Sequence, residues 1–216
     1  MTHYGIELEF FIIKDGVPVP AYLHTNNLDG CQMIGEIKSI VSPDIVSVIF
    51  DTKKKLYQER VKLNANGLDL ALISQATFTD QDLKERRRNQ GKEFKQLDEK
   101  SIYFGRTGKL LPRKLFKASL QLNISDNKTK FITSSRLSNG VLTDRSYHIE
   151  YSETFDYFSI IRKLDLKFKK EIKESNRIPG VYAIKTGEKG LRIEYRSLPN
   201  NIDLEYLIRA VKNTTV

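Results

Sequence analysis

Two short segments, one near each end of the chain, constrain the fold most because each places carboxylates inside the pattern of a β-strand. They are Gly5–Phe11 and Leu191–Pro199. Residues two apart in a strand project from the same face, so Glu7 and Glu9 share one face and the apolar residues between them occupy the other. A carboxylate that is buried without a partner is costly or becomes protonated. Carboxylates at such positions, Glu194 among them, therefore indicate a sheet that binds cations, and more than one.

Two interior segments repeat this pattern. Glu36 lies in a segment of strand character, and Asp29 stands seven residues before it. In another such segment Gln121 and Asn123 alternate with leucine and isoleucine, so the two amides share a face. If these strands belong to one sheet, a single surface carries the carboxylates and amides, and the opposite surface is apolar and covered by helices.

Guanidinium groups would join this polar surface, since Arg192 and Arg196 share a strand face with Glu194. Divalent cations such as Mg²⁺ are held by a few carboxylates together with substrate phosphates, and arginine neutralises a transferring phosphoryl group. An ordinary alternative is that strand positions facing solvent are often charged, and that Glu opposite Arg forms a cross-strand pair. The pattern alone leaves both interpretations open.

The length and composition fit a globular protein that is not embedded in a membrane. The 216 residues suit one domain or at most two small ones. The chain has no apolar run long enough to span a membrane, and a strand pattern begins directly after Met1, so we expect neither a membrane segment nor a signal peptide. The single cysteine, Cys31, excludes an internal disulfide and fits a reducing compartment, so we expect a cytoplasmic protein.

The net charge of +9 would attract anions such as nucleotides, nucleic acid or acidic substrates. A Lys-rich composition that simply favours solubility is the alternative. The basic residues are dense over Lys84–Arg88, where we expect a solvated helix face, with contact to a phosphate backbone as the alternative. The same alternative applies to a later basic set, formed by Arg106, Lys109, Arg113, Lys114 and Lys117.

Secondary-structure signals predict an α+β fold of antiparallel strands with helices on one face. Strands are predicted at residues 4–13, 33–40, 118–125, 181–185 and 191–197, and helices at about 43–66, 155–176 and 203–211. The pattern of residues 68–78 is ambiguous and slightly favours a strand. Ser42 is the expected cap of the first helix, and Pro43 its first residue. We expect a single domain over residues 1–216, with residues 79–115 as a candidate exposed basic insertion.

These motifs resemble those of the carboxylate–amine ligases, or amidoligases, which belong with γ-glutamylcysteine ligase in the glutamine-synthetase-like superfamily. The segment Gly5–Phe10 looks like their opening strand, and Asp29 with Glu36 resembles the Asp-x6-Glu element of the γ-glutamylcysteine ligases. The Gln121-x-Asn123 strand resembles that of one branch. Other amidoligases carry His-x-His there, and this chain departs from that pattern.

The C-terminal motifs are the most specific part of the resemblance. Arg177–Tyr182, Lys185 and Glu194–Pro199 are similar to the C-terminal core of small phage-encoded amidoligases, which implies a bacterial or phage setting. The matched segments cover about a third of the chain and are spread from end to end.

The resemblance implies a fold, a reaction and a set of site residues. The fold is a curved antiparallel, partly mixed sheet of about six strands, with helices on one face and ATP with two or three Mg²⁺ ions bound to the sheet. A substrate carboxylate attacks the γ-phosphate to give an acyl phosphate, and an amine then displaces phosphate to leave an amide. The implied roles are metal ligation by Glu7, Glu9, Glu36 and Glu194, catalysis by Arg196, Arg177 and Asp29, and nucleotide binding by Gln121, Asn123 and Lys185.

A second class of function stays open. A member of this family that has lost catalysis would act as a module that binds nucleic acid or protein. The substrates could also be carried by a macromolecule, since the sequence names neither the acid nor the amine. We expect no membrane partner.

Overall fold

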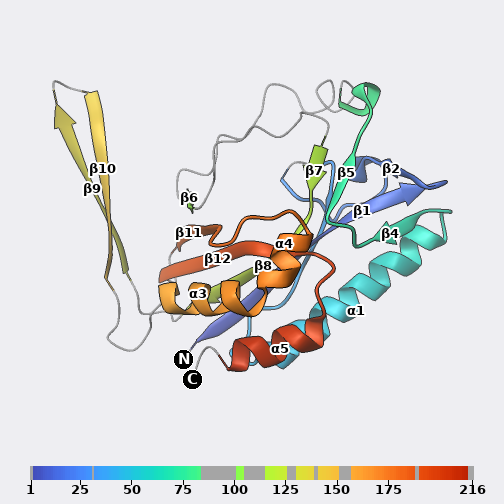
Figure 1. Cartoon of the computed structure of the whole chain (residues 1–216). Coiled ribbons are helices and arrows are strands. Elements are labelled where there is room, and N and C mark those ends of the chain that lie inside the picture. Colours follow the sequence, from blue (N-terminus) through green and yellow to red (C-terminus); the bar gives the residue numbers. More distant parts are fainter. Residues whose placement is uncertain are drawn as a thin grey trace.

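Figure 1 shows the computed structural model, which describes residues 2–30, 32–83, 101–104, 115–125, 130–138, 141–150, 157–187 and 190–213. Side chains are described for residues 2–30, 32–83, 116–125, 159–183 and 192–213. Within these parts the chain is α+β, with an antiparallel sheet and helices on one of its faces, as the sequence predicts.

The main sheet has eight strands among the described residues, and all of its pairings are antiparallel. Its strands are β1 (His3–Lys14), β2 (Val17–Val19), β3 (Gly35–Lys38), β4 (Asp69–Ala71), β6 (Ser101–Phe104), β8 (Ser119–Ser125), β11 (Tyr182–Gly187) and β12 (Gly190–Pro199). The order is β2-β1-β8-β12-β11-β6, and β3 and β4 also pair with β1. The long β1 therefore pairs with most strands in one half of the sheet, and β12 joins β8 to β11 in the other half.

Two further antiparallel pairs stand apart from the main sheet. They are β5 (Gln75–Thr77) with β7 (Leu115–Lys117), and β9 (Lys130–Ser138) with β10 (Val141–Glu150). A hairpin turn at Asp15 and Gly16, both with positive φ, joins β1 to β2. Pro18 cannot donate a ladder hydrogen bond, and β2 accordingly lies at an end of the strand order.

The first long helix, α1 (Ile45–Asn64), begins two residues later than the sequence analysis predicted. The cap is Asp44, because its carboxylate accepts hydrogen bonds from the backbone N–H groups of Val46 and Ser47. Ser42 is instead held beside β1, where its backbone exchanges hydrogen bonds with Tyr4. The predicted cap at Ser42 is therefore wrong, and Pro43 lies outside the helix.

The second predicted helix is divided in two, α3 (Tyr157–Lys167) and α4 (Lys169–Glu174). The division falls at Phe168, whose φ of −105° and ψ of 21° depart from helical values. Its ring is fully buried and meets the Tyr206 ring edge-on at 5.1 Å. The described residues also include a helical turn at 80–83, the short 3-10 turn η1 (Ala21–Leu23) and α5 (Leu204–Lys212), which is capped by Asp203 and begins one residue later than predicted.

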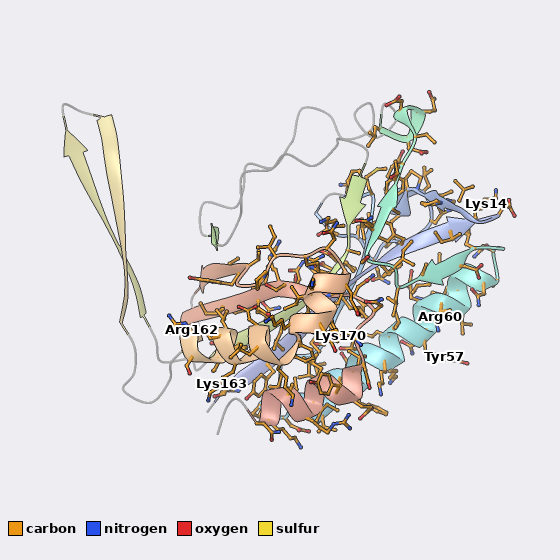
Figure 2. The ribbon with its side chains drawn as sticks, in the orientation of Figure 1. Lys14, Tyr57, Arg60, Arg162, Lys163 and Lys170 are labelled. Atoms are coloured by element: carbon orange, nitrogen blue, oxygen red, sulfur yellow. The ribbon has the colours of Figure 1, made fainter. Side chains whose placement is uncertain are left out.

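The larger of two apolar clusters in the described residues lies between the sheet and the helices, and a smaller one gathers around Phe11, Met33 and Phe78. The sheet contributes the apolar positions of β1, β8 and β12, and the helices contribute the inward positions of α1, α3, α4 and α5, among them Ile6, Leu8, Leu122, Ile193, Tyr195, Val48, Leu164 and Leu207. Basic side chains stand on the outer side of the helices, and Figure 2 labels Arg162, Lys163 and Lys170 there. None of the helices in the described parts combines the length and apolar character that a membrane span requires.

Candidate functional site

The sheet register brings the predicted site residues of four strands onto the face opposite the core. Three cross-strand pairs form: Glu9 with Glu36, Glu7 with Gln121, and Asn123 with Glu194. Directly opposed residues in neighbouring strands project from the same face. Segments far apart in the sequence therefore build one polar surface across β3, β1, β8 and β12.

A β-bulge shapes this surface in β12. Tyr195 pairs with Leu122 and Leu198 pairs with Leu120, so Arg196 and Ser197 together oppose the single residue Gln121. The extra residue lets Leu198 return to the core, where it is fully buried. Val181 holds the bulge, since its carbonyl accepts from the Arg196 N–H at 2.8 Å and its own N–H donates to Ser197 Oγ at 2.9 Å. Bulges of this kind re-aim side chains next to functional sites.

Three carboxylates converge at the β1–β3 side of the surface. Oxygen atoms of Glu9, Asp29 and Glu36 all lie within 4.8 Å of one another. Asp29 comes from the loop before β3, which is fixed because the Asp29 N–H donates to the Ile34 carbonyl at 3.1 Å. This spacing suits a divalent cation that takes one oxygen from each group.

Close packing of β3 on β1 depends on a glycine. A Cβ at Gly35 would come within 2.2 Å of the Phe10 ring, and that ring is fully buried in the core. Any side chain at this position would push β3 away from β1. Gly35 therefore allows Glu36 to reach its place opposite Glu9.

Burial raises the pKa of two members of this cluster. The pKa of Glu9 rises to about 7, chiefly through burial and then through the charge of Asp29. The pKa of Glu36 rises to about 8, again chiefly through burial, although its bond with the Lys38 ammonium at 2.8 Å opposes the rise. Without a bound cation Glu36 thus favours the protonated form near neutral pH and Glu9 is about half protonated there. Shifts of this kind are common at functional sites.

The orientation of Glu9 is fixed by three donors from β8. Its Oε2 accepts from the backbone N–H and the hydroxyl of Ser119 at 2.6 and 2.9 Å, and its Oε1 accepts from Gln121 Nε2 at 2.7 Å. Similarly, Asn123 Nδ2 donates to Glu7 Oε1 at 3.3 Å. The two amide groups therefore turn their NH₂ ends towards carboxylates of β1.

The oxygen ends of the same amides make no hydrogen bond. Gln121 Oε1 and Asn123 Oδ1 are buried, and neither accepts from a donor within the described side chains and backbone. Gln121 is 1% exposed and Asn123 is 5% exposed. Buried acceptors without donors are rare and unfavourable. Such oxygens next to carboxylates form the donor set that hard cations prefer.

The β12 side of the surface is rich in guanidinium groups. The Glu194 side chain is fully buried and pairs with Arg196 through Nε and Nη2. Arg192 Nη2 lies 3.9 Å from the other oxygen of Glu194. Arg196 and Arg192 keep 22% and 41% of their side-chain surface exposed. The surface thus has an acidic half on β1 and β3 and an arginine half on β12, with the amides between them.

Arg177 lies beside this surface and is tied to the backbone. Its Nη1 and Nη2 donate to the carbonyls of Ala118 and Arg196, each at 2.8 Å, so it links the residue just before β8 to the bulge of β12. Burial lowers the pKa of this guanidinium, and the nearby Glu9 carboxylate opposes that effect. In this structure Arg177 acts first as a clamp on the bulge.

Several other predicted site residues lie wholly or partly outside the described residues. Lys185 pairs with Arg192 in the sheet register, but its side chain lies outside the described residues. The stretch Lys84–Arg88 also lies outside them, and so do most of the later basic residues, from Arg106 to Lys114. Lys117 is described, and its ammonium donates to the Asn176 carbonyl at 2.7 Å.

Two contributors to the surface were missed from the sequence, Lys38 and Ser119. Each lies two residues from a predicted site residue in the same strand, so strand alternation places it on the same face. That spacing was the available signal. Each also has a defined contact, Lys38 with Glu36 and Ser119 with Glu9.

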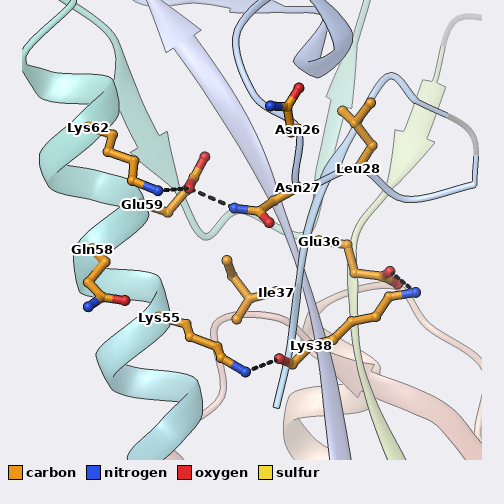
Figure 3. Close-up of a pocket in the computed structure, with 10 residues that line it drawn as sticks. All are labelled: Asn26, Asn27, Leu28, Glu36, Ile37, Lys38, Lys55, Gln58, Glu59 and Lys62. Carbon is orange, nitrogen blue, oxygen red and sulfur yellow. Dashed lines mark hydrogen bonds and ion pairs between the residues drawn. The ribbon is translucent and has the colours of Figure 1, made fainter. Parts of the chain in front are cut away.

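A pocket of about 370 Å³ lies near this site but faces another way. It is lined by residues of the loop before β3, by β3 itself and by α1, including Asn27, Ile37, Lys55 and Glu59. Figure 3 shows Ile37 on the α1 side of β3, while the Glu36 carboxylate points away from α1 to Lys38. In the wall, Asn27 Nδ2 donates to the buried Glu59 carboxylate at 2.7 Å. Glu36 and Lys38 also line the pocket, so it borders the carboxylate cluster at β3, while most of its other lining residues come from the α1 side.

Comparisons of the chain with protein-family models, with curated proteins and with solved structures found no match.

Proposed function

We propose that this chain is an ATP- and Mg²⁺-dependent ligase that joins a carboxylate to an amine through an acyl phosphate, on a glutamine-synthetase-like sheet. One observation carries the proposal. A cluster of three carboxylates and a pair of arginines share one sheet face, and buried amide oxygens without donors lie between them. The resemblance of the sequence motifs to amidoligases agrees with this arrangement.

The residues present fit divalent cations. Glu9, Asp29 and Glu36 supply oxygens close enough to share one ion. Gln121 and Asn123 supply the neutral oxygens beside them. A bound Mg²⁺ would offset the charge of the nucleotide phosphates and orient them for attack. The raised pKa values of Glu9 and Glu36 also fit, since a cation would favour the ionised form that burial disfavours.

The arginine half of the surface would stabilise the negative charge of the transferring phosphoryl group. Arg196 is held by Glu194 and by the bulge, so its planar fork has a fixed direction on the surface. A guanidinium fixed in this way neutralises the phosphoryl group as it transfers. Arg192 lies on the same face and is the second candidate for contact with phosphate. Arg177 acts indirectly, by holding the backbone of the bulge.

The substrate carboxylate and the amine would meet between these halves. Glu7 lies there, partly exposed and beside Asn123. In this proposal Glu7 and Glu194 are the outer ligands for the second cation, and Asp29 either binds a cation or receives the amine. The carboxylate oxygen attacks the γ-phosphorus while ADP leaves, and the amine nitrogen then forms the C–N bond while phosphate leaves.

The test is release of ADP from ATP in the presence of Mg²⁺ and a panel of amino acids and amines, preceded by calorimetry with ATP and Mg²⁺. We expect turnover to fall by at least about 100-fold in Glu194→Gln and in Arg196→Ala, the size of effect seen when one fixed electrostatic contact is removed. Glu174→Gln and Arg162→Ala alter exposed charges on α4 and α3 and serve as matched controls. Absence of both nucleotide and Mg²⁺ binding in calorimetry would overturn the proposal.

A further inference from the structure

The outward side of α1 carries four apolar side chains in one stripe. Val46, Phe50, Tyr57 and Val61 are 40%, 69%, 68% and 49% exposed. At about 100° per residue these positions fall within about 60° of the helix circumference, and they extend over about 22 Å of its axis. The opposite side of α1 already fills the core with Ile45, Val48, Ile49 and Leu63. The stripe is therefore a second apolar surface that the fold itself does not use.

Basic residues flank this stripe on both sides. Lys53 and Arg60 lie on one flank, and Lys54 lies on the other, all within about one helical turn of an aromatic ring. Lys53 is paired with Glu205 of α5. Figure 2 shows Tyr57 and Arg60 together on α1, on the side away from the sheet.

The acidic residues of α1 point elsewhere. Asp51 is engaged by Lys55 at 2.9 Å and by the Ile40 N–H at 2.8 Å. Glu59 is 4% exposed and accepts from Asn27 in the wall of the pocket. The outward face of α1 thus combines aromatic rings with positive charge and presents no carboxylate from its own helix.

We propose that the outward face of α1 binds single-stranded nucleic acid. Aromatic side chains interleaved with lysine and arginine form a platform on which bases stack while phosphates meet the cations. The Phe50 and Tyr57 rings are about 10 Å apart along the helix, so they contact separate bases of one extended strand. A second copy of this chain fits less well, because stacking α1 on α1 brings like charges together. The inference goes beyond the proposed ligase activity and does not depend on it.

The test is fluorescence anisotropy of a fluorescein-labelled oligothymidylate of about 20 nucleotides with the full chain. We expect binding that weakens by about 7- to 20-fold between about 50 and 200 mM NaCl, the range for two to three neutralised phosphates on a single strand. The double variant Phe50→Ala/Tyr57→Ala should bind at least about 10-fold more weakly with an unchanged salt dependence, since it removes stacking and leaves the cations. The matched control is Leu166→Ala, which removes an apolar side chain that is 74% exposed on α3.

A charge-matched pair of variants tests the cations. Lys54→Ala/Arg60→Ala should lower the slope of log affinity against log salt by about 1.4, because two phosphate contacts are lost. Lys14→Ala/Lys163→Ala removes the same charge from exposed positions off the stripe and should change affinity by less than about twofold. Far-UV circular dichroism checks that all variants are folded.

Three results would overturn the inference. They are an absence of oligothymidylate binding, equal binding by the wild type and by Phe50→Ala/Tyr57→Ala, and loss of binding in the off-stripe control as large as in Lys54→Ala/Arg60→Ala. The second result would assign any binding to another surface. Binding to phosphatidylserine vesicles without binding to the oligonucleotide would assign the stripe to membranes instead.

Discussion

The two faces of the main sheet are built by the same strands, and each contains deeply buried side chains, yet these side chains differ in chemistry. On the helix-covered face, Leu8 and Leu122 are 1% and 0% exposed within a continuous apolar core. On the other face, Glu9 and Glu36 are 7% and 5% exposed, and burial raises the pKa of both. Deep burial thus occurs on both faces, but it raises the pKa of two carboxylates on one face and encloses only hydrocarbon at these positions on the other.

This difference has an energetic consequence. The apolar face stabilises the fold by removing hydrocarbon from water. The polar face opposes folding when no cation is bound, because it removes carboxylates and amide oxygens from water without full compensation. Substitutions on the apolar face should therefore lower the stability of the fold and leave cation binding intact. Substitutions of carboxylates on the polar face should abolish cation binding and leave the stability of the cation-free protein unchanged or higher.

The largest expected effect is on the apolar face. Leu122→Ala should lower the free energy of unfolding by about 3 kcal/mol, since Leu122 is fully buried at the centre of β8 and its truncation leaves a cavity. Urea denaturation measures the change. The rise in Tm caused by Mg²⁺ should persist in this variant. Loss of that rise in a folded Leu122→Ala protein would contradict the separation of the two faces.

The next effect is on the polar face. Mg²⁺ at about 100 times its Kd should add about 2.7 kcal/mol to the stability of the wild type, and a chelator should remove the gain. Glu36→Gln should abolish this gain while leaving the cation-free protein as stable as the wild type or more so, because a neutral amide avoids the free-energy cost of protonating this carboxylate on folding. Thermal unfolding with and without Mg²⁺ measures both quantities. Glu174→Gln, at an exposed position on α4, should behave like the wild type.

The third effect is on how the free energy of unfolding depends on pH when no divalent cation is present. Folding raises the pKa of Glu9 to about 7 and that of Glu36 to about 8, from an ordinary value of 4.5. The charged groups that influence them are Glu7, Asp29, Lys38 and Arg177. Between pH 4.5 and 8 the folded state keeps protons on Glu9 and Glu36 that the unfolded state releases. The stability that comes from this difference in proton binding is therefore complete below pH 4.5 and is lost as pH rises through 7 to 8.

We expect the loss to be about 1 to 3 kcal/mol over this range, measured by urea denaturation at a series of pH values. The dependence should be shallower in Glu36→Gln. With saturating Mg²⁺ the dependence should largely disappear between pH 4.5 and 8, because cation binding keeps these carboxylates ionised in the folded state, as they are in the unfolded state. A wild-type profile identical to that of Glu36→Gln would show that the buried carboxylate does not titrate as described.

The smallest expected effect is at the N-terminus of α1, where substitutions distinguish the observed cap, Asp44, from the predicted cap, Ser42. Asp44→Ala should cost about 1 kcal/mol of stability, since it removes the acceptor for two backbone N–H groups of α1, while cation binding stays intact. Ser42→Ala should cost less in the same chemical denaturation measurement. The reverse order would restore Ser42 as the cap.

The faces of individual strands could be predicted because alternation is a local property. Glu7 with Glu9, and Gln121 with Asn123, share a face for that reason, and the structure agrees. The strands predicted at 181–185 and 191–197 likewise correspond to β11 and β12. The α+β class followed from these elements and their helices.

Features that depend on long-range register could not be predicted. The pairing of Glu9 with Glu36 and the bulge at Arg196 arise only when distant strands align. The role of Arg177 as a backbone clamp also requires the bulge that it holds. The cap of α1 moved to Asp44 because Ser42 is engaged by Tyr4 of β1, a contact that no local pattern contains.

The most direct test of the central claim, that the polar face binds cations, is the location of Mn²⁺ by anomalous scattering in crystals grown with Mn²⁺ and a non-hydrolysable ATP analogue. We expect an anomalous peak about 2 Å from oxygens of Glu9, Asp29 and Glu36, with the phosphates directed towards Arg196. Peaks located only elsewhere, with Lys38 still bonded to Glu36 and the three carboxylates without metal, would contradict the account.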